Sequence, residues 1–163
     1  MRRAFIAGAR SGDQAAIVIT ETTGTFDDPM AGYQMSGKMF SEGADIVFSC
    51  AGKSGTGGIR AAAEHNAYYF GTDINQIPLD PEHVLGSRMK NIDIVVLDMV
   101  KKLTEGDYSG GLTVYSLKDN GLDVLLNEKL VSPDITEKTE ETKKRIIEGR
   151  LDVVALSEGI HDK

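Results

Sequence analysis

Residues 43–64 read GADIVFSCAGKSGTGGIRAAAE, and they place an apolar, β-branched run directly before a glycine-rich turn and a helix-like segment. Further short apolar runs of this kind lie in residues 15–24, 67–74, 83–90 and 111–117. In chain order, the first three apolar runs are residues 15–24, the run before the glycine-rich turn, and residues 67–74. Small and apolar residues at helical spacing lie between them, in residues 30–43 and 58–66. Strand, helix and strand at this rhythm favour parallel strands joined by crossover helices. The sequence therefore predicts an α/β fold with a doubly wound, mostly parallel sheet.

Residues 92–106 and 132–149 are predicted to form two further helices. The first helix ends at Gly106 behind two lysines, as a helix C-terminus should. Its broad apolar face consists of Ile92, Val95, Val96, Met99, Val100 and Leu103. The second helix begins with Ser132 as its N-cap and Pro133 in its first turn. We expect residues 1–163 to form one α/β lobe in which these two helices are available to pack against a partner lobe or a partner chain.

Composition bounds the classes of function. A chain of 163 residues that is 40% hydrophobic suits one compact domain. Its net charge of −7 argues against a general nucleic-acid binder, because such a protein needs a basic face to neutralise phosphates. Cys50 is the only cysteine, and its apolar surroundings predict a buried, inert thiol. The three histidines show no spacing typical of metal ligands, so neither a metal site nor a cofactor is predicted.

The loop CAGKSGTGG, residues 50–58, contains a Gly-Lys-Ser sequence that suggests a phosphate-binding loop. A P-loop would require a glycine at position 47, where this chain has Val47, and a dinucleotide fingerprint would require one at Arg60. What remains is a glycine-rich turn at the carboxyl end of a strand, where open α/β sheets bind small molecules. A tight turn without a ligand is an equally good interpretation of this stretch alone.

The neighbouring strand ends favour a binding site. Because the carboxyl ends of parallel strands lie along one edge of a sheet, several side chains and the loop are expected to converge there. These are Phe26, the loop from Gly52 to Gly58, Asp73 and Lys90. An aromatic ring can stack on a base, and a charged pair can hydrogen-bond vicinal hydroxyls of a sugar. Taken singly, Phe26 could instead belong to the core, Asp73 could cap a turn, and Lys90 could form a salt bridge.

The chain resembles the basic membrane protein family of ABC-transporter substrate-binding lipoproteins, which includes purine nucleoside receptors. The resemblance rests on segments that cover most of the chain in order and spacing: GTFDDP, GADIVFSCAGKSGTGGIRAAAE, YYFGTDINQ, VLGSRMKNIDIVVLDMVKKLTEGDYSGG, YSLKDNGLDV and KKRIIEGRLDV. It implies one lobe of a type I periplasmic-binding-protein fold. It further implies that Phe26 stacks on a base, that the Gly52 and Gly55 region contacts the ligand through its backbone, and that Asp73 and Lys90 hold sugar hydroxyls.

The match covers only the carboxyl-terminal lobe of the family. The apolar face of residues 92–106 then lacks the partner that the other lobe would supply, so we expect a homo-oligomer, most simply a dimer. The resemblance also implies a transporter permease as partner and an extracytoplasmic, membrane-associated location. No signal segment or lipobox is present, so a natural start at Met1 would instead imply a cytoplasmic protein.

Two other classes of function remain open at this stage. One is a cytoplasmic ligand-sensing or structural dimeric lobe with no role in transport. The other is an enzyme acting on nucleosides, with Asp73, Lys90 and Ser54 as candidates for catalysis. No acid–base or nucleophile–base pair is visible at useful spacing, so the enzyme is the weaker hypothesis.

Overall fold

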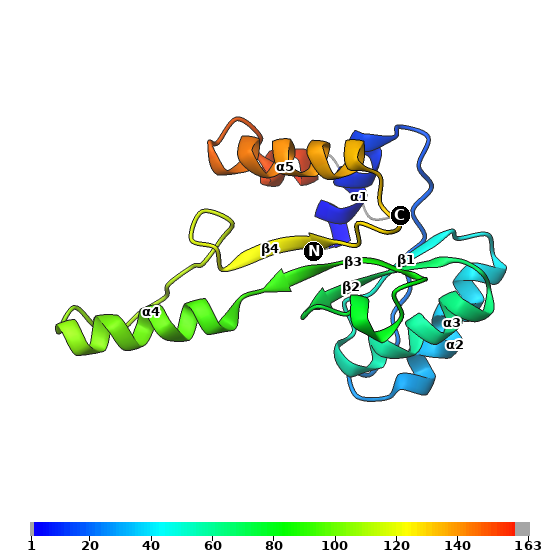
Figure 1. Ribbon diagram of the computed structural model, residues 1–163, viewed down its shortest axis with the longest axis horizontal. Helices are drawn as coiled ribbons and strands as arrows, with labels where there is room; N and C mark the ends of the chain where they lie inside the picture. Colours follow the sequence, from blue (N-terminus) through cyan, green and yellow to red (C-terminus); the bar gives the residue numbers. More distant parts are fainter. Residues whose placement is uncertain (1, 159–163) are drawn as a thin grey trace.

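The computed structural model describes residues 2–158 of the chain. Figure 1 shows the arrangement of its helices and strands. In chain order these are α1 (Arg2–Gly12), α2 (Pro29–Ser41), β1 (Ile46–Phe48), the 3-10 helix η1 (Gly52–Thr56), α3 (Gly57–Glu64), β2 (Tyr68–Asp73), the 3-10 helix η2 (Ile77–Leu79), β3 (Val84–Lys90), α4 (Ile92–Glu105), β4 (Leu122–Leu126), α5 (Pro133–Ile147) and α6 (Val153–Glu158). The predicted helices in residues 30–43, 58–66, 92–106 and 132–149 correspond to α2, α3, α4 and α5.

The strands form one sheet of four strands in the order β1-β2-β3-β4. β1 pairs parallel with β2, and β2 pairs parallel with β3, whereas β4 runs antiparallel to β3. Short parallel strands need a crossover of a dozen or more residues between them, and α3 provides that crossover between β1 and β2. The structure thus confirms the predicted α/β class and mostly parallel sheet.

Helices cover both faces of this sheet. On one face, α2 and α3 enclose a core of buried side chains: Phe40, Val47, Ile59, Ala61, Ala62, Ala67, Tyr69 and Val84. On the other face, Phe5 of α1 stacks on Phe48 of β1 with ring centroids 4.8 Å apart, and Phe48 in turn contacts Phe70 of β2. Since successive side chains of a strand point to opposite faces, Val47 packs into the core and Phe48 packs against α1 on the other face.

The start of α2 lies directly on the glycine loop. Asp28 caps the helix by accepting a hydrogen bond from the N–H of Met30 at 2.9 Å, and Pro29 occupies the first turn. A Cβ at Gly32 would lie 1.7 Å from the carbonyl oxygen of Ser54, and one at Gly57 would lie 1.8 Å from that of Pro29. Glycine is therefore required at both positions for the two backbones to approach this closely.

Two predicted strands are wrong. Residues 15–24 and 111–117 form no strand, and each run leaves an apolar side chain open to solvent, with Ile17 90% and Leu112 92% exposed. A β-branched run becomes a strand only beside a partner that takes its backbone hydrogen bonds, and neither run has one within residues 2–158. The strand that does follow α4 is β4, which pairs with β3 from Leu122 onwards.

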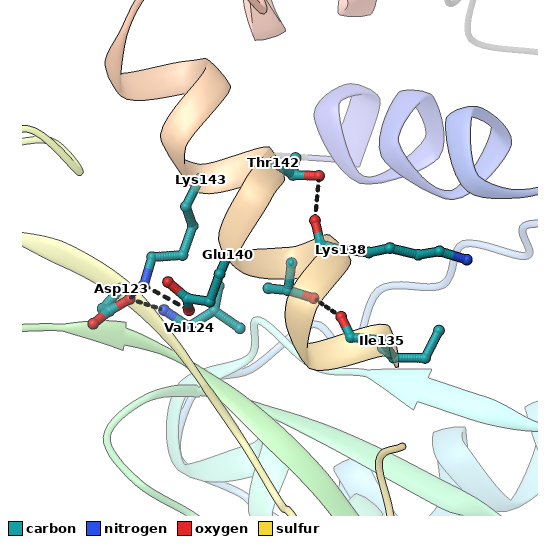
Figure 2. A network of polar contacts seen from close by, with 8 residues as sticks. Asp123, Val124, Ile135, Lys138, Glu140, Thr142 and Lys143 are labelled. Carbon is teal, nitrogen blue, oxygen red and sulfur yellow. Dashed lines mark hydrogen bonds and ion pairs between the residues drawn. The ribbon is translucent and has the colours of Figure 1, made fainter. Parts of the chain in front are cut away.

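The helices α4 and α5 differ in how they are held. Figure 1 shows α4 projecting from the sheet, and it contains no buried residue. In contrast, α5 is joined to β4 by an ion pair between Lys143 and Asp123 at 2.7 Å, which Figure 2 shows together with Glu140. The hydrogen bond that Lys143 donates to the carboxylate of Asp123 raises the pKa of Lys143. Neither these helices nor any other within residues 2–158 combine the length and apolar character needed to cross a membrane.

Candidate functional site

Phe26 and Gly52 lie against each other beyond the end of β1. The N–H of Ser54 donates to the carbonyl oxygen of Phe26 at 3.2 Å, and a Cβ at Gly52 would come within 3.5 Å of the Phe26 ring. Gly52 has a φ of +56°, a conformation that side chains disfavour. The ring of Phe26 is 73% exposed, so Phe26 does not belong to the core. The structure therefore brings together these two predicted site residues and leaves an aromatic surface open to solvent.

Ser54 fastens the segment around Phe26 to the loop. Its side chain is fully buried, donates to the carbonyl oxygen of Thr25 at 3.0 Å and accepts from the N–H of Asp28 at 3.0 Å. Both interactions span more than 25 residues of sequence. The hydroxyl of Ser54, a candidate for catalysis from the sequence, thus forms internal hydrogen bonds that hold the segment before α2 in place.

Gly55 belongs to the buried part of the loop. A Cβ there would be 2.4 Å from the hydroxyl oxygen of Ser49 and 3.1 Å from that of Tyr69, so packing alone accounts for the glycine. Burial raises the pKa of Tyr69 to about 12, and its hydroxyl is therefore protonated at neutral pH. Gly55 sits further from solvent than Gly52, which is exposed.

Asp73 and Lys90, the two charged residues predicted for the site, form an ion pair. Asp73 ends β2 and Lys90 ends β3, and the Nζ of Lys90 lies 3.0 Å from Oδ1 of Asp73. Nη2 of Arg88 lies 2.8 Å from the same oxygen. The side chains of Asp73 and Lys90 remain 41% and 45% exposed, so both can reach a ligand. The sequence pattern did not predict the contact of Arg88 with Asp73, because a position in a strand does not show which neighbouring side chain it reaches.

Cys50 is exposed, and the prediction of a buried thiol is wrong. The apolar run before it predicted burial, but β1 ends at Phe48, and Cys50 lies past the rim of the sheet. Partial desolvation raises the pKa of its thiol, with Arg88 opposing and Asp73 adding to this effect. Both charges belong to the ion-paired cluster at the ends of β2 and β3.

The carboxyl ends of β1, β2 and β3 therefore carry an open aromatic ring, a glycine turn, a carboxylate and an ammonium group. The ring can stack on a planar group, while the carboxylate accepts hydrogen bonds and the ammonium donates them. Within residues 2–158 no group of three histidine, cysteine, aspartate or glutamate side chains could hold a metal ion. A cavity of about 270 Å³ lies between β4 and α5, and one of its lining residues, Leu122, pairs with Lys90 at the end of β3.

Comparison with known proteins identifies the relatives of this chain. The family model described as "Bmp: ABC transporter substrate-binding protein PnrA-like" matches residues 1–156. Basic membrane protein D of Borreliella burgdorferi is 35% identical in an alignment of length 155 that covers 91% of this chain and 46% of that protein. The "ABC transporter nucleoside-binding protein BmpA" of Lactococcus lactis is 30% identical in an alignment of length 169, gaps included, that covers 93% of this chain and 48% of that protein. The chain thus spans about half the length of these curated relatives.

A solved structure shows the same fold. The crystal structure of an ABC transporter system solute-binding protein from Aeropyrum pernix K1 superposes with a TM-score of 0.75 at 24% identity, over 92% of this chain and 51% of that one. This likeness confirms the predicted lobe of a periplasmic-binding-protein fold. The family model and the curated relatives together show that the chain belongs to the Bmp family of PnrA-like ABC transporter substrate-binding proteins.

Proposed function

We propose that this lobe binds a purine nucleoside-like ligand at the carboxyl ends of β1, β2 and β3. The observation that carries the proposal is the cluster in which Lys90 and Arg88 both contact Oδ1 of Asp73. Within residues 2–158 no hydrogen bond or ion pair involves Oδ2 of Asp73, so that oxygen can accept a hydrogen bond from a ligand hydroxyl. The name of the Lactococcus lactis relative, a nucleoside-binding protein, supports this class of ligand.

Each group has a defined role in the proposed complex. The exposed Phe26 stacks on the base, the exposed backbone of Gly52 contacts the ligand, and the buried Gly55 supports the loop from inside the protein. Asp73 accepts from one sugar hydroxyl, and Lys90 donates to the neighbouring one. One wall buries less of a ligand than a closed cleft, and we therefore expect an affinity in the range of about 0.1 to 1 mM for this lobe alone.

Isothermal titration calorimetry with adenosine, guanosine and inosine up to millimolar concentration tests the proposal. Asp73→Asn keeps the size of the side chain but removes its charge, and we expect it to weaken binding about tenfold. Asp107→Asn provides the matched control, because Asp107 is exposed in the segment after α4 and should leave the affinity unchanged. Absence of heat with all three nucleosides would refute the proposed ligand class.

We further propose that a second copy of the chain covers the apolar face of α4. Five side chains of this helix are exposed by about half or more, namely Ile92, Val96, Leu97, Val100 and Leu103. An apolar patch on an isolated helix usually marks an association surface. Sedimentation velocity should show a dimer that Val100→Lys dissociates, whereas a monodisperse monomer of the unmodified protein would contradict this proposal.

The family assignment supports a role in transport. We propose that the activity of the whole protein is the delivery of its solute to an ABC transporter permease at the outer face of the cytoplasmic membrane. Co-purification with a permease of the same organism, stabilised by the nucleoside, is the expected result. Retention of the permease at equal levels by a variant that cannot bind nucleoside would contradict ligand-dependent delivery.

A further inference from the structure

Asp73 carries two cations on one of its oxygens. Nη2 of Arg88 lies 2.8 Å and Nζ of Lys90 lies 3.0 Å from Oδ1, and neither is paired with Oδ2. A carboxylate with a single cation can rotate to share both oxygens with it. Two donors that approach one oxygen from different strand positions fix the plane of the carboxylate, because a rotation that improves one contact weakens the other.

The backbone of Asp73 also needs support. Its φ is +72°, in the left-handed region that residues other than glycine seldom adopt. This conformation turns the chain at the end of β2, where the N–H of Ile74 donates to the carbonyl oxygen of Thr72. A contact from the neighbouring strand can hold such a turn.

Arg88 is placed to provide that contact. It pairs with Thr72 in the parallel register between β2 and β3, one residue before Asp73. Its side chain is only 21% exposed, and its Nε is buried without a hydrogen-bond partner among the described residues. A largely buried guanidinium needs a nearby anion to offset its desolvation, and Asp73 supplies it. Lys90 is 45% exposed and more freely solvated, so it retains the freedom to turn to a ligand.

We infer that Arg88 is a positioning residue, which holds Asp73 so that Oδ2 and the ammonium of Lys90 face the ligand as an adjacent acceptor and donor. This inference rests on the proposed function. The two cations then have different roles. Arg88 orients the carboxylate of Asp73, and Lys90 donates a hydrogen bond to the ligand. The pair that results has the polarity needed to bind two neighbouring hydroxyls of a sugar.

The test compares two ligands that differ only in those hydroxyls. Calorimetric titrations of adenosine and 2′,3′-dideoxyadenosine are run on the unmodified protein, on Arg88→Met and on Arg88→Lys. We expect Arg88→Met to weaken binding of adenosine about five- to tenfold and to leave that of the dideoxy ligand within about twofold. Arg88→Lys should restore part of the difference. Arg60→Met is the matched control, because Arg60 is exposed on α3 and bonded to Glu64.

Equal loss of affinity for both ligands, or no loss for either, would overturn the positioning role of Arg88. If the unmodified protein binds neither nucleoside, the proposed function fails instead. A double-mutant cycle of Arg88→Met and Asp73→Asn then tests the interaction between these two residues without any ligand. It compares the unfolding equilibrium constants of the unmodified protein, the two single variants and the double variant. A coupling of about fivefold supports positioning by Arg88, and additive effects overturn it.

Discussion

Replacing Ser54 by alanine tests whether one buried hydroxyl holds the Phe26 segment against the glycine loop. The substitution removes the hydrogen bond donated to the carbonyl oxygen of Thr25 and the one accepted from the N–H of Asp28. Each is expected to contribute about 1 kcal/mol, because both backbone groups lie in partly exposed residues and regain some hydration. The expected loss is about 2 kcal/mol in the free energy of unfolding, or about 4 to 8 °C in the melting temperature of a chain of this size.

Urea denaturation followed by circular dichroism measures this loss directly. Ser41→Ala is the matched control, since Ser41 also donates to a backbone carbonyl, that of Gly37, but at an exposed position. We expect the control to change stability by less than about 0.5 kcal/mol. Because Ser54 fixes the approach of Phe26 to Gly52, its replacement should also weaken nucleoside binding more than Ser41→Ala does. Equal stability of the two variants would refute the reasoning.

Three further predictions concern packing and charge. Gly32→Ala should destabilise the protein by at least about 3 kcal/mol in urea denaturation, because its Cβ would lie 1.7 Å from a backbone oxygen of η1. The control is Gly37→Ala in the same helix. Its Cβ would have its nearest neighbouring atom at 3.7 Å, so this change should be neutral or stabilising. The pKa of Tyr69 is about 12 in the folded protein against 10.0 ordinarily. The stability that the protonated hydroxyl contributes is therefore complete below pH 10 and is lost as the pH rises through 12. At pH 12 the free energy of unfolding should be lower by roughly 2 kcal/mol from this cause, and Tyr69→Phe should lack this loss. Lys143→Met should cost about 1 kcal/mol by removing the ion pair between α5 and β4, and Lys138→Met, whose side chain points away in Figure 2, should show no comparable loss in the same assay.

Local patterns predicted the helices better than the strands. The helix signals lie within the helix itself: Ser132 and Pro133 start α5, and Gly106 ends α4 in the left-handed conformation. A strand depends on its neighbour. The run in residues 15–24 is as β-branched as β1, but no described strand lies beside it to accept its hydrogen bonds. The run in residues 111–117 fails for the same reason, and the pairing with β3 begins only at Leu122.

The sequence predicted part of the candidate site, since Phe26 lies against Gly52 and Asp73 is paired with Lys90. The pair of Asp73 and Lys90 follows from the rule that parallel strands end at a common edge. Phe26 follows no strand, and hydrogen bonds with Ser54 hold its segment beside Gly52 instead. The contact of Arg88 with Asp73 did not follow from that rule. The alternation of side chains along β3 predicts only the face of the sheet on which Arg88 lies, and not its contact with the last residue of β2. The register shift between Tyr69 and Phe70 lies in the same strand pair, and no sequence pattern marks it.

The contact of α2 with the glycine loop has a consequence for how ligands are discriminated. Backbone meets backbone at Gly32 and Gly57, so no layer of side chains lies between the helix and the loop that could repack around ligands of different shape. This part of the protein is preorganised, and little conformational entropy is lost there when a ligand binds. Differences in affinity among nucleosides should therefore arise in the enthalpy of their contacts with a fixed surface, and a calorimetric series should show them there.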